Sequence, residues 1–143
     1  MGNKKAIVCP SCQALNRVDQ TAAQQKQAVC GKCGNPLSDQ NYVINISENL
    51  LEKIIKHSEV PVVIDAYADW CGPCKMYGPI FEEVAKEDSP KAQFFKVDTE
   101  KNQSFAMKYG IRGIPTTLVF HKGKLVTNQS GLLQKEQLKS LLS

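Results

Sequence analysis

The sequence predicts an α/β protein with a mixed sheet flanked by helices, preceded by a small zinc-ribbon domain. After residue 41, β-branched and aromatic runs alternate with amphipathic stretches and end in a hairpin pattern. The first 40 residues hold no aromatic side chain, but they hold four of the six cysteines. So small a segment, with so few large apolar side chains, needs a metal or a disulfide to fold.

These observations divide the chain into residues 1–40 and residues 41–143. Turn-forming residues dominate 34–41, which is where we place the linker. A length of 143 residues, with 42% hydrophobic and 22% charged side chains, suits one globular domain with a small satellite. The lysines of the first region lack interleaved aromatic residues, so we do not expect a nucleic-acid interface.

In the larger region, residues 42–46 have the composition of a short strand. Ser47 can cap a helix that runs to His57, because apolar residues recur there on one helical face. The next strand, 60–67, is an apolar run interrupted only by Asp65. A carboxyl group in such a strand is expected to have a raised pKa.

Residues 71–87 then form the expected main helix, in which Pro79 predicts a kink. A β-branched and aromatic run predicts a third strand at 92–97, and a short helix is expected at 103–109. Residues 116–120 and 125–130 predict a hairpin around Lys122-Gly123-Lys124. A last helix at 135–142 would turn its leucines toward the core.

The cysteines indicate the compartment. No apolar segment follows the basic N-terminal residues, and the longest apolar run, near 60–64, is too short to span a bilayer. We therefore expect a cytoplasmic protein without a membrane partner. Cytosolic thiols stay reduced, so the six cysteines should bind metal or carry out redox chemistry rather than form three structural disulfides.

Cys71-Gly72-Pro73-Cys74 lies where a strand meets a helix. A cysteine at a helix N-terminus faces unpaired N–H groups and the positive end of the helix dipole, which favour the thiolate. Cys71 is therefore the expected nucleophile, and Cys74, one turn later, can resolve a mixed disulfide. Pro73 stiffens the turn between them. The alternatives are half of a metal site or two buried thiols, but no fourth C-x-x-C pair exists to complete a metal shell.

The N-terminal cysteines have the spacing of a metal site. Cys9-x2-Cys12-x17-Cys30-x2-Cys33 fits the pattern of two knuckles that hold one Zn²⁺ with four thiolates. Four protein ligands leave no open position, so the expected role is structural. Two disulfides and a bound iron are the alternatives, and zinc is the metal we expect.

Three segments resemble the thioredoxin family: 63–75, 108–116, and 120–123 with Gly131. The resemblance covers about residues 43–143 and implies a thioredoxin fold and protein-disulfide reductase activity. It implies Asp65 as a third catalytic residue, which takes the proton of Cys74. It also implies a set of residues that support the site or border the substrate groove: Trp70, Gly72, Pro73, Lys96, Ile114, Pro115 in the cis form, and Gly131.

The same resemblance implies no tightly bound organic cofactor. Electrons would come from NADPH through thioredoxin reductase to a monomer that acts on disulfide-containing proteins such as ribonucleotide reductase, methionine sulfoxide reductase and peroxiredoxins. Tyr67 departs from the family by standing where many members have a second tryptophan. Met76 is expected in the core.

With its N-terminal cysteines the chain resembles the bacterial thioredoxin 2 type. One hypothesis is that oxidation of the zinc thiolates releases the metal and changes the activity of the redox domain. Alternatively, the ribbon recruits a protein or a nucleic acid. A third interpretation, an oxidase or isomerase, is disfavoured by the Gly72-Pro73 dipeptide, which is typical of a reducing pair.

Overall fold

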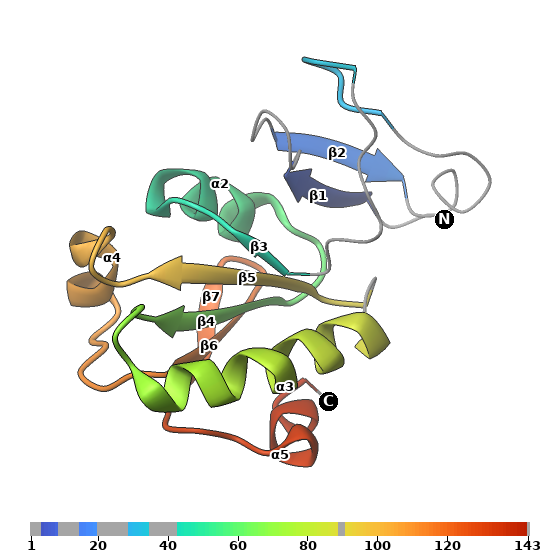
Figure 1. The fold of residues 1–143 in the computed structure, drawn as a ribbon. Coiled ribbons are helices and arrows are strands. Elements are labelled where there is room, and N and C mark those ends of the chain that lie inside the picture. The colour runs from blue at the N-terminus through green and yellow to red at the C-terminus, as the bar shows by residue number, and fades with distance from the viewer. Residues whose placement is uncertain (1–3, 9–14, 20–28, 35–42, 89–90, 143) are drawn as a thin grey trace.

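The computed structural model describes residues 4–8, 15–19, 29–34, 43–88 and 91–142. Within them the chain forms a two-stranded and a five-stranded sheet (Figure 1). The smaller sheet pairs β1, Lys4–Val8, with β2, Leu15–Asp19, in antiparallel fashion. The sequence patterns did not predict these two strands.

The larger sheet has the strand order β3-β5-β4-β6-β7. Strands β3, β5 and β4 are parallel, whereas β6 is antiparallel to β4 and β7 to β6. The predicted mixed sheet is therefore confirmed. The five strands are β3 (Val43–Asn45), β4 (Val62–Tyr67), β5 (Gln93–Asp98), β6 (Thr116–His121) and β7 (Lys124–Ser130).

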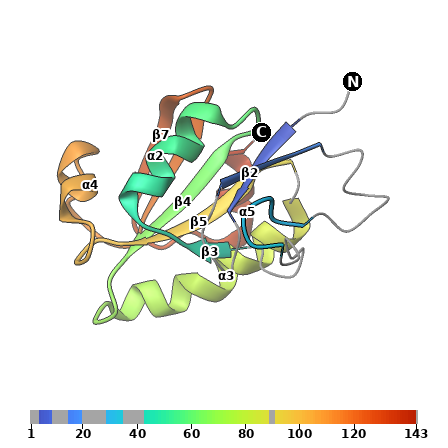
Figure 2. The same ribbon diagram turned by 90° about the horizontal axis from the view of Figure 1, so that it is seen from above.

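Four described helices accompany this sheet, within two residues of where the patterns placed them. They are α2 (Glu48–His57), α3 (Gly72–Asp88), α4 (Gln103–Lys108) and α5 (Lys135–Ser140). Figure 2 shows α2 and α3 on opposite sides of the sheet. Helix α3 continues through Pro79, and Ser47 caps α2 by position without a side-chain hydrogen bond.

Alternation along the strands divides the core into two clusters, one on each face of the sheet. On one face, Ile64 and Leu118 pack with residues of α2 and with Phe105 of α4. On the other face, Val63 packs with Phe81 of α3 and with residues of α5. The sheet is thus covered on both sides, which explains the near-continuous apolar run of β4.

The hairpin between β6 and β7 closes in two residues. His121 pairs with Lys124, and both residues between them have positive φ, at 53° for Lys122 and 81° for Gly123. Two residues with positive φ match the right-handed twist of adjacent strands, and a glycine at the second position makes this turn accessible. The predicted hairpin is confirmed. Within the part of the chain that is described, no helix is long and apolar enough to cross a membrane.

Candidate active site

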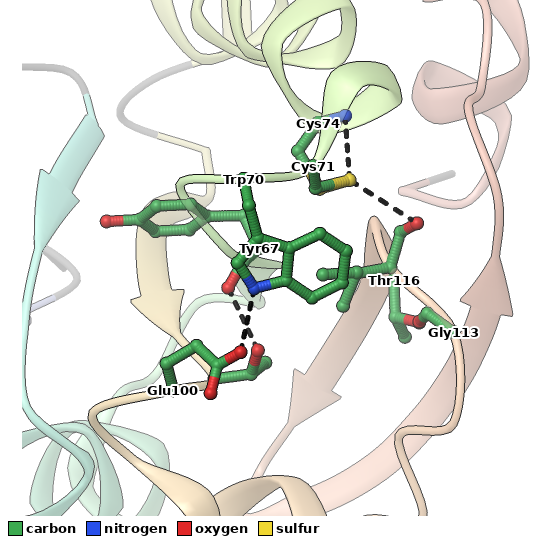
Figure 3. The surroundings of a disulfide bond; sticks show 9 residues. Tyr67, Trp70, Cys71, Cys74, Glu100, Gly113 and Thr116 are labelled. Carbon is green, nitrogen blue, oxygen red and sulfur yellow. Dashed lines mark hydrogen bonds between the residues drawn. A yellow bond between two sulfur atoms is a disulfide. The ribbon is translucent and has the colours of Figure 1, made fainter.

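The two cysteines of the third C-x-x-C pair lie where β4 leads into α3. Cys71 directly precedes the helix, and Cys74 belongs to its first turn. They form a disulfide with a Cα–Cα distance of 5.3 Å (Figure 3). Both side chains are only 4% exposed, so solvent exposure alone does not distinguish the two sulfurs.

Hydrogen bonding does distinguish them. The backbone N–H of Cys74 donates to Cys71 Sγ at 3.2 Å. This is one of the unpaired N–H groups at the N-terminus of the helix, and such a donor stabilises negative charge on the sulfur. Cys71 Sγ also lies 3.7 Å from the carbonyl oxygen of Ile114, to which a reduced Cys71 thiol could donate. The arrangement favours Cys71 as the thiolate.

Trp70 lies exposed beside the disulfide. Its side chain is 69% exposed, and its indole Nε1–H donates to Glu100 Oε1 at 2.7 Å (Figure 3). The sequence patterns missed Glu100. It follows the end of β5, and the carboxyl ends of parallel neighbours such as β4 and β5 meet at one edge of the sheet, which brings residues 70 and 100 together.

The opposite rim of the site is built around Pro115. The Ile114–Pro115 peptide bond is cis, as the resemblance implied. The backbone N–H of Gly131 donates to the carbonyl oxygen of Pro115 at 2.8 Å. Gly131 has a φ of 99°, a conformation that residues with a Cβ rarely adopt. Thr116 anchors the same segment by donating its hydroxyl to the carbonyl oxygen of Gly113.

Asp65 lies on β4 and is completely buried. Its side chain faces α3, because Val63, two residues earlier on the same strand, packs in the α3 cluster. Burial raises the pKa of Asp65 to about 7, and the positive charge of Lys96 opposes part of that rise. The raised pKa expected from the sequence is confirmed, and it lets Asp65 gain and lose a proton near neutrality.

Lys96 is the register partner of Asp65 on β5. It is half-buried, and its Nζ lies 4.6 Å from the centroid of the Tyr67 ring. Tyr67 in turn packs against the cluster formed by Ala68 and the two cysteines. Lys96 thus acts electrostatically on the buried carboxyl group of Asp65 and contacts the aromatic ring of Tyr67.

Tyr77 was not singled out from the sequence. It is a fully buried residue of α3 whose hydroxyl lies 2.6 Å from the Thr117 hydroxyl on β6. Burial raises the pKa of Tyr77, and the nearby Asp65 raises it further, so it stays neutral. The contact between Tyr77 and Thr117 could have been predicted only from the strand register, which places Thr117 opposite Asp65.

Met76 is a correction to the sequence interpretation. It was expected in the core, but its side chain is 64% exposed on α3. Helix α3 buries Tyr77, Phe81 and Val84 on one face, and Met76 lies outside that face. Together with Trp70 it adds exposed apolar surface near the N-terminal end of the helix.

Of the four N-terminal cysteines, the structure describes two. Cys30 is buried and Cys33 is exposed, whereas Cys9 and Cys12 lie outside the described residues. Cys30 Sγ accepts hydrogen bonds from Asn16 Nδ2 and from the backbone N–H of Lys32, both at 3.4 Å. In the described ranges, which contain only half of the predicted ligands, no group of three possible metal ligands is present.

Comparison with known proteins gives a consistent result for residues 42–143, which match the family model described as Thioredoxin. A thioredoxin of Pseudomonas aeruginosa is 37% identical over 101 residues, which are 71% of this chain and 94% of that protein. Among solved structures, a mutant thioredoxin from Halobacterium salinarum superposes with a TM-score of 0.66 at 33% identity. That match covers 73% of this chain and 91% of the other.

One relative extends the similarity toward the N-terminus. Thioredoxin C-3 of Corynebacterium nephridii is 40% identical over 139 residues, which are 95% of this chain and 92% of that protein. The Pseudomonas protein is matched almost entirely by the larger region alone. The match to the Corynebacterium protein therefore extends into the N-terminal region, whereas the Pseudomonas protein has only about the length of the larger region.

Proposed function

The chain belongs to the thioredoxin family, and on that premise we propose how its residues reduce a protein disulfide. As a family member it is a thiol–disulfide oxidoreductase of the protein-disulfide reductase class. Thioredoxins act on disulfide-containing substrates and are reduced again by thioredoxin reductase. The observation that carries the proposal is the Cys71–Cys74 disulfide at the start of α3. The preceding strand, β4, carries Asp65, whose pKa burial raises to about 7.

In the reduced protein, the Cys71 thiolate attacks one sulfur of the substrate disulfide. A mixed disulfide forms, and the other substrate sulfur leaves as a thiolate that takes up a proton. The Cys74 thiol then gives its proton to the Asp65 carboxylate and attacks Cys71 Sγ. This step closes the Cys71–Cys74 disulfide and releases the second substrate sulfur as a thiolate, which takes up a proton. Two electrons have passed from the protein to the substrate.

The support for these roles differs between the residues. For Cys71 it is the N–H of Cys74 directed at its sulfur. For Asp65 it is a pKa of about 7, so that the carboxylate is available as a base above that pH and is protonated below it. Resolution by Cys74 should therefore slow as the pH falls through about 7.

The rim of the site suits extended protein segments rather than one small ligand. The exposed indole of Trp70, and Ile114 and Pro115 next to Gly131, would border the groove in which the substrate backbone lies. Gly72 and Pro73, both exposed at the start of α3, form the surface directly beside the buried Cys71. Substrates of the proposed kind include ribonucleotide reductase, methionine sulfoxide reductase and peroxiredoxins.

Two single substitutions test the roles of the cysteines, each as the matched control for the other. Insulin reduction with dithiothreitol should fail for Cys71→Ser and Cys74→Ser alike. Only Cys74→Ser, which keeps the nucleophile, should accumulate a mixed disulfide with the substrate, visible by non-reducing mass spectrometry. Trapping by Cys71→Ser instead would reverse the assignment. If both variants reduced insulin as fast as the wild type, the proposal would be refuted. The alternative function, in which the N-terminal zinc ribbon recruits a protein or nucleic-acid partner, would then be favoured.

For the N-terminal domain, residues 1–40, we propose a structural Zn²⁺ held by Cys9, Cys12, Cys30 and Cys33. The support is the ligand spacing and the two N–H donors directed at Cys30 Sγ, which suit a thiolate better than a thiol. When bound, the ion would crosslink two turns of a segment with little apolar core. This arrangement is the thioredoxin 2 type, and a reducing compartment such as the cytoplasm would keep the thiolates intact.

Metal analysis with a thiol count tests this site. We expect one zinc per chain and its loss in Cys30→Ser, whereas two disulfides would leave no metal and fewer thiols. The same preparation tests redox sensing. Peroxide should release zinc and change the rate of insulin reduction by the larger domain, and an unchanged rate after complete release would reject sensing.

A further inference from the structure

A row of polar side chains crosses the α3-facing side of the sheet. Asn45 on β3 is the register partner of Lys96 on β5, and Lys96 is the partner of Asp65 on β4. Asp65 is in turn opposite Thr117 on β6. Four strands therefore contribute one polar residue each at the same level, and residues opposite one another in neighbouring strands direct their side chains to the same face.

Tyr67 closes this row on the side of the cysteines. It lies two residues after Asp65 on β4, so both side chains face α3. Its hydroxyl accepts a hydrogen bond from Asn45 Nδ2, and its ring lies under the Lys96 ammonium, with Nζ 4.6 Å from the centroid. One aromatic side chain thus contacts two members of the row.

The position of the Lys96 ammonium matters because Asp65 has no other polar partner in the described part of the chain. Neither carboxyl oxygen of Asp65 has a hydrogen-bond partner there. Lys96 therefore acts on Asp65 through space. On the side of α3, its Nζ would lie 3.9 Å from a Cβ built on Gly78, which is an ordinary contact distance and places the ammonium next to the helix.

We propose that Tyr67, anchored by Asn45, is a positioning residue that holds the Lys96 ammonium on its ring and away from direct contact with Asp65. The inference rests on the proposed function, because it concerns the group to which that function assigns the proton of Cys74. The aromatic face attracts the cation, and the hydrogen bond from Asn45 fixes the face in place. Tyr67 and Asn45 together form the clamp on Lys96.

The clamp has a consequence for the proton step. An unpaired carboxylate in an apolar interior attracts any ammonium within reach, and a direct ion pair would lower its pKa well below neutrality. An ammonium kept at the ring lowers the pKa of Asp65 less, so that it remains about 7. Without the ring, Lys96 should move to Asp65 and leave it ionised, and therefore unable to return a proton, at neutral pH.

Few other charged or titratable groups face Asp65. From α3 it meets Tyr77, whose hydroxyl is paired with Thr117 of β6. From β5 it meets Lys96, and from its own strand Tyr67. Burial raises the pKa of Tyr67 most, the hydrogen bond from Asn45 opposes part of that rise, and Asp98 and Asp69 raise it further, so the ring stays neutral.

The test is the titration of Asp65 in the oxidised full-length chain, in which the active-site thiols do not titrate. The ¹³C shift of its carboxyl carbon, assigned with Asp65→Asn, is followed from pH 4 to 9. Tyr67→Leu should lower the apparent pKa by about one unit or more, the size expected for a closer opposite charge. Tyr67→Phe keeps the ring without the anchor and should shift it by less than half as much.

A double-mutant cycle separates positioning from a change in burial. In a Lys96→Met background Tyr67→Leu should leave the titration of Asp65 unchanged, because no ammonium remains to be released. If Tyr67→Leu lowered the pKa of Asp65 equally with and without Lys96, the proposal would be overturned. An unchanged or raised pKa of Asp65 in Tyr67→Leu would overturn it as well. A shift in Tyr67→Phe as large as in Tyr67→Leu would overturn the ring as the holding group.

The titration is independent of substrate turnover. If the wild-type chain failed to reduce insulin, the proposed function would fall while the clamp could still be seen in the carboxyl shifts. Conversely, normal reduction by the wild type with an unmoved titration in Tyr67→Leu would reject the clamp alone. Near-ultraviolet circular dichroism of each variant verifies that the fold is retained.

Discussion

Asp65→Asn is expected to stabilise the oxidised protein at neutral and alkaline pH. Burial raises the pKa of Asp65 from 3.8 to about 7, so the folded state binds this proton more tightly than the unfolded chain. The stabilisation from the neutral carboxyl group is complete below about pH 4 and is lost as the pH rises to about 7. A difference of about three pKa units corresponds to about 4 kcal/mol of unfolding free energy, which an uncharged amide would restore.

Urea unfolding of the oxidised wild type and of Asp65→Asn, at pH 5 and pH 8.5, measures this contribution. The variant should be more stable by about 4 kcal/mol at pH 8.5 and by less than half of that at pH 5. Asp69→Asn, an exposed carboxylate four residues later, is the matched control and should change stability by about 0.5 kcal/mol or less. A gap between the wild type and Asp65→Asn that stays constant with pH would refute the raised pKa as its cause.

Three further predictions concern the surroundings of the site. Glu100→Ala removes the hydrogen-bond acceptor of the Trp70 indole and should lower the fluorescence anisotropy of this single tryptophan. Glu100→Gln keeps an acceptor oxygen and should preserve the anisotropy. Equal anisotropy in both variants would contradict the role of the hydrogen bond. Phe81→Ala opens a cavity in the α3 core and should cost about 3 to 5 kcal/mol in denaturant unfolding. Glu87→Gln loosens the ion pair to Lys139 that joins α3 to α5, and the resulting small drop in melting temperature should shrink in 1 M NaCl.

Local patterns were enough for the elements of the larger sheet and for the two candidate redox cysteines, whereas the catalytic role of Asp65 was implied only by the resemblance to thioredoxins. The run around Asp65 showed a carboxyl group among apolar residues, and burial alone accounts for most of the rise in its pKa. Cys71 and Cys74 followed from the position of their motif at a strand–helix junction. These features depend on residues within one turn or one strand, where periodicity and helix-end chemistry decide the outcome.

Features that depend on strand order could not be predicted in this way. Asn45 meets Tyr67 because β5 lies between their strands, and a linear pattern does not specify that order. The contact of Trp70 with Glu100 likewise requires two parallel strands to end at one edge. Met76 was misplaced because α3 buries a narrower face than its apolar composition suggests.

Asp65 lowers the free energy of unfolding at neutral and alkaline pH, yet the proposed mechanism needs its carboxylate as a proton acceptor. An apolar residue of similar size at this position would remove the cost of ionisation but also the proton acceptor that the proposed mechanism gives to Cys74. Functional sites commonly keep such destabilising groups. The stability gained by Asp65→Asn thus measures the free energy of unfolding that the protein loses by keeping an ionisable carboxyl group on β4.

The place of β3 in the sheet also affects how the chain can assemble during synthesis. Within the described sheet β3 neighbours β5 alone, and Val43 pairs with Phe94 about fifty residues later. At 5–20 residues per second, the ribosome needs about 3 to 10 s to make the intervening chain. Through that interval the β3 segment, and with it Asn45, has no strand to join. The newly made chain therefore completes its edge strand, and the clamp on Lys96, only after β5 has emerged.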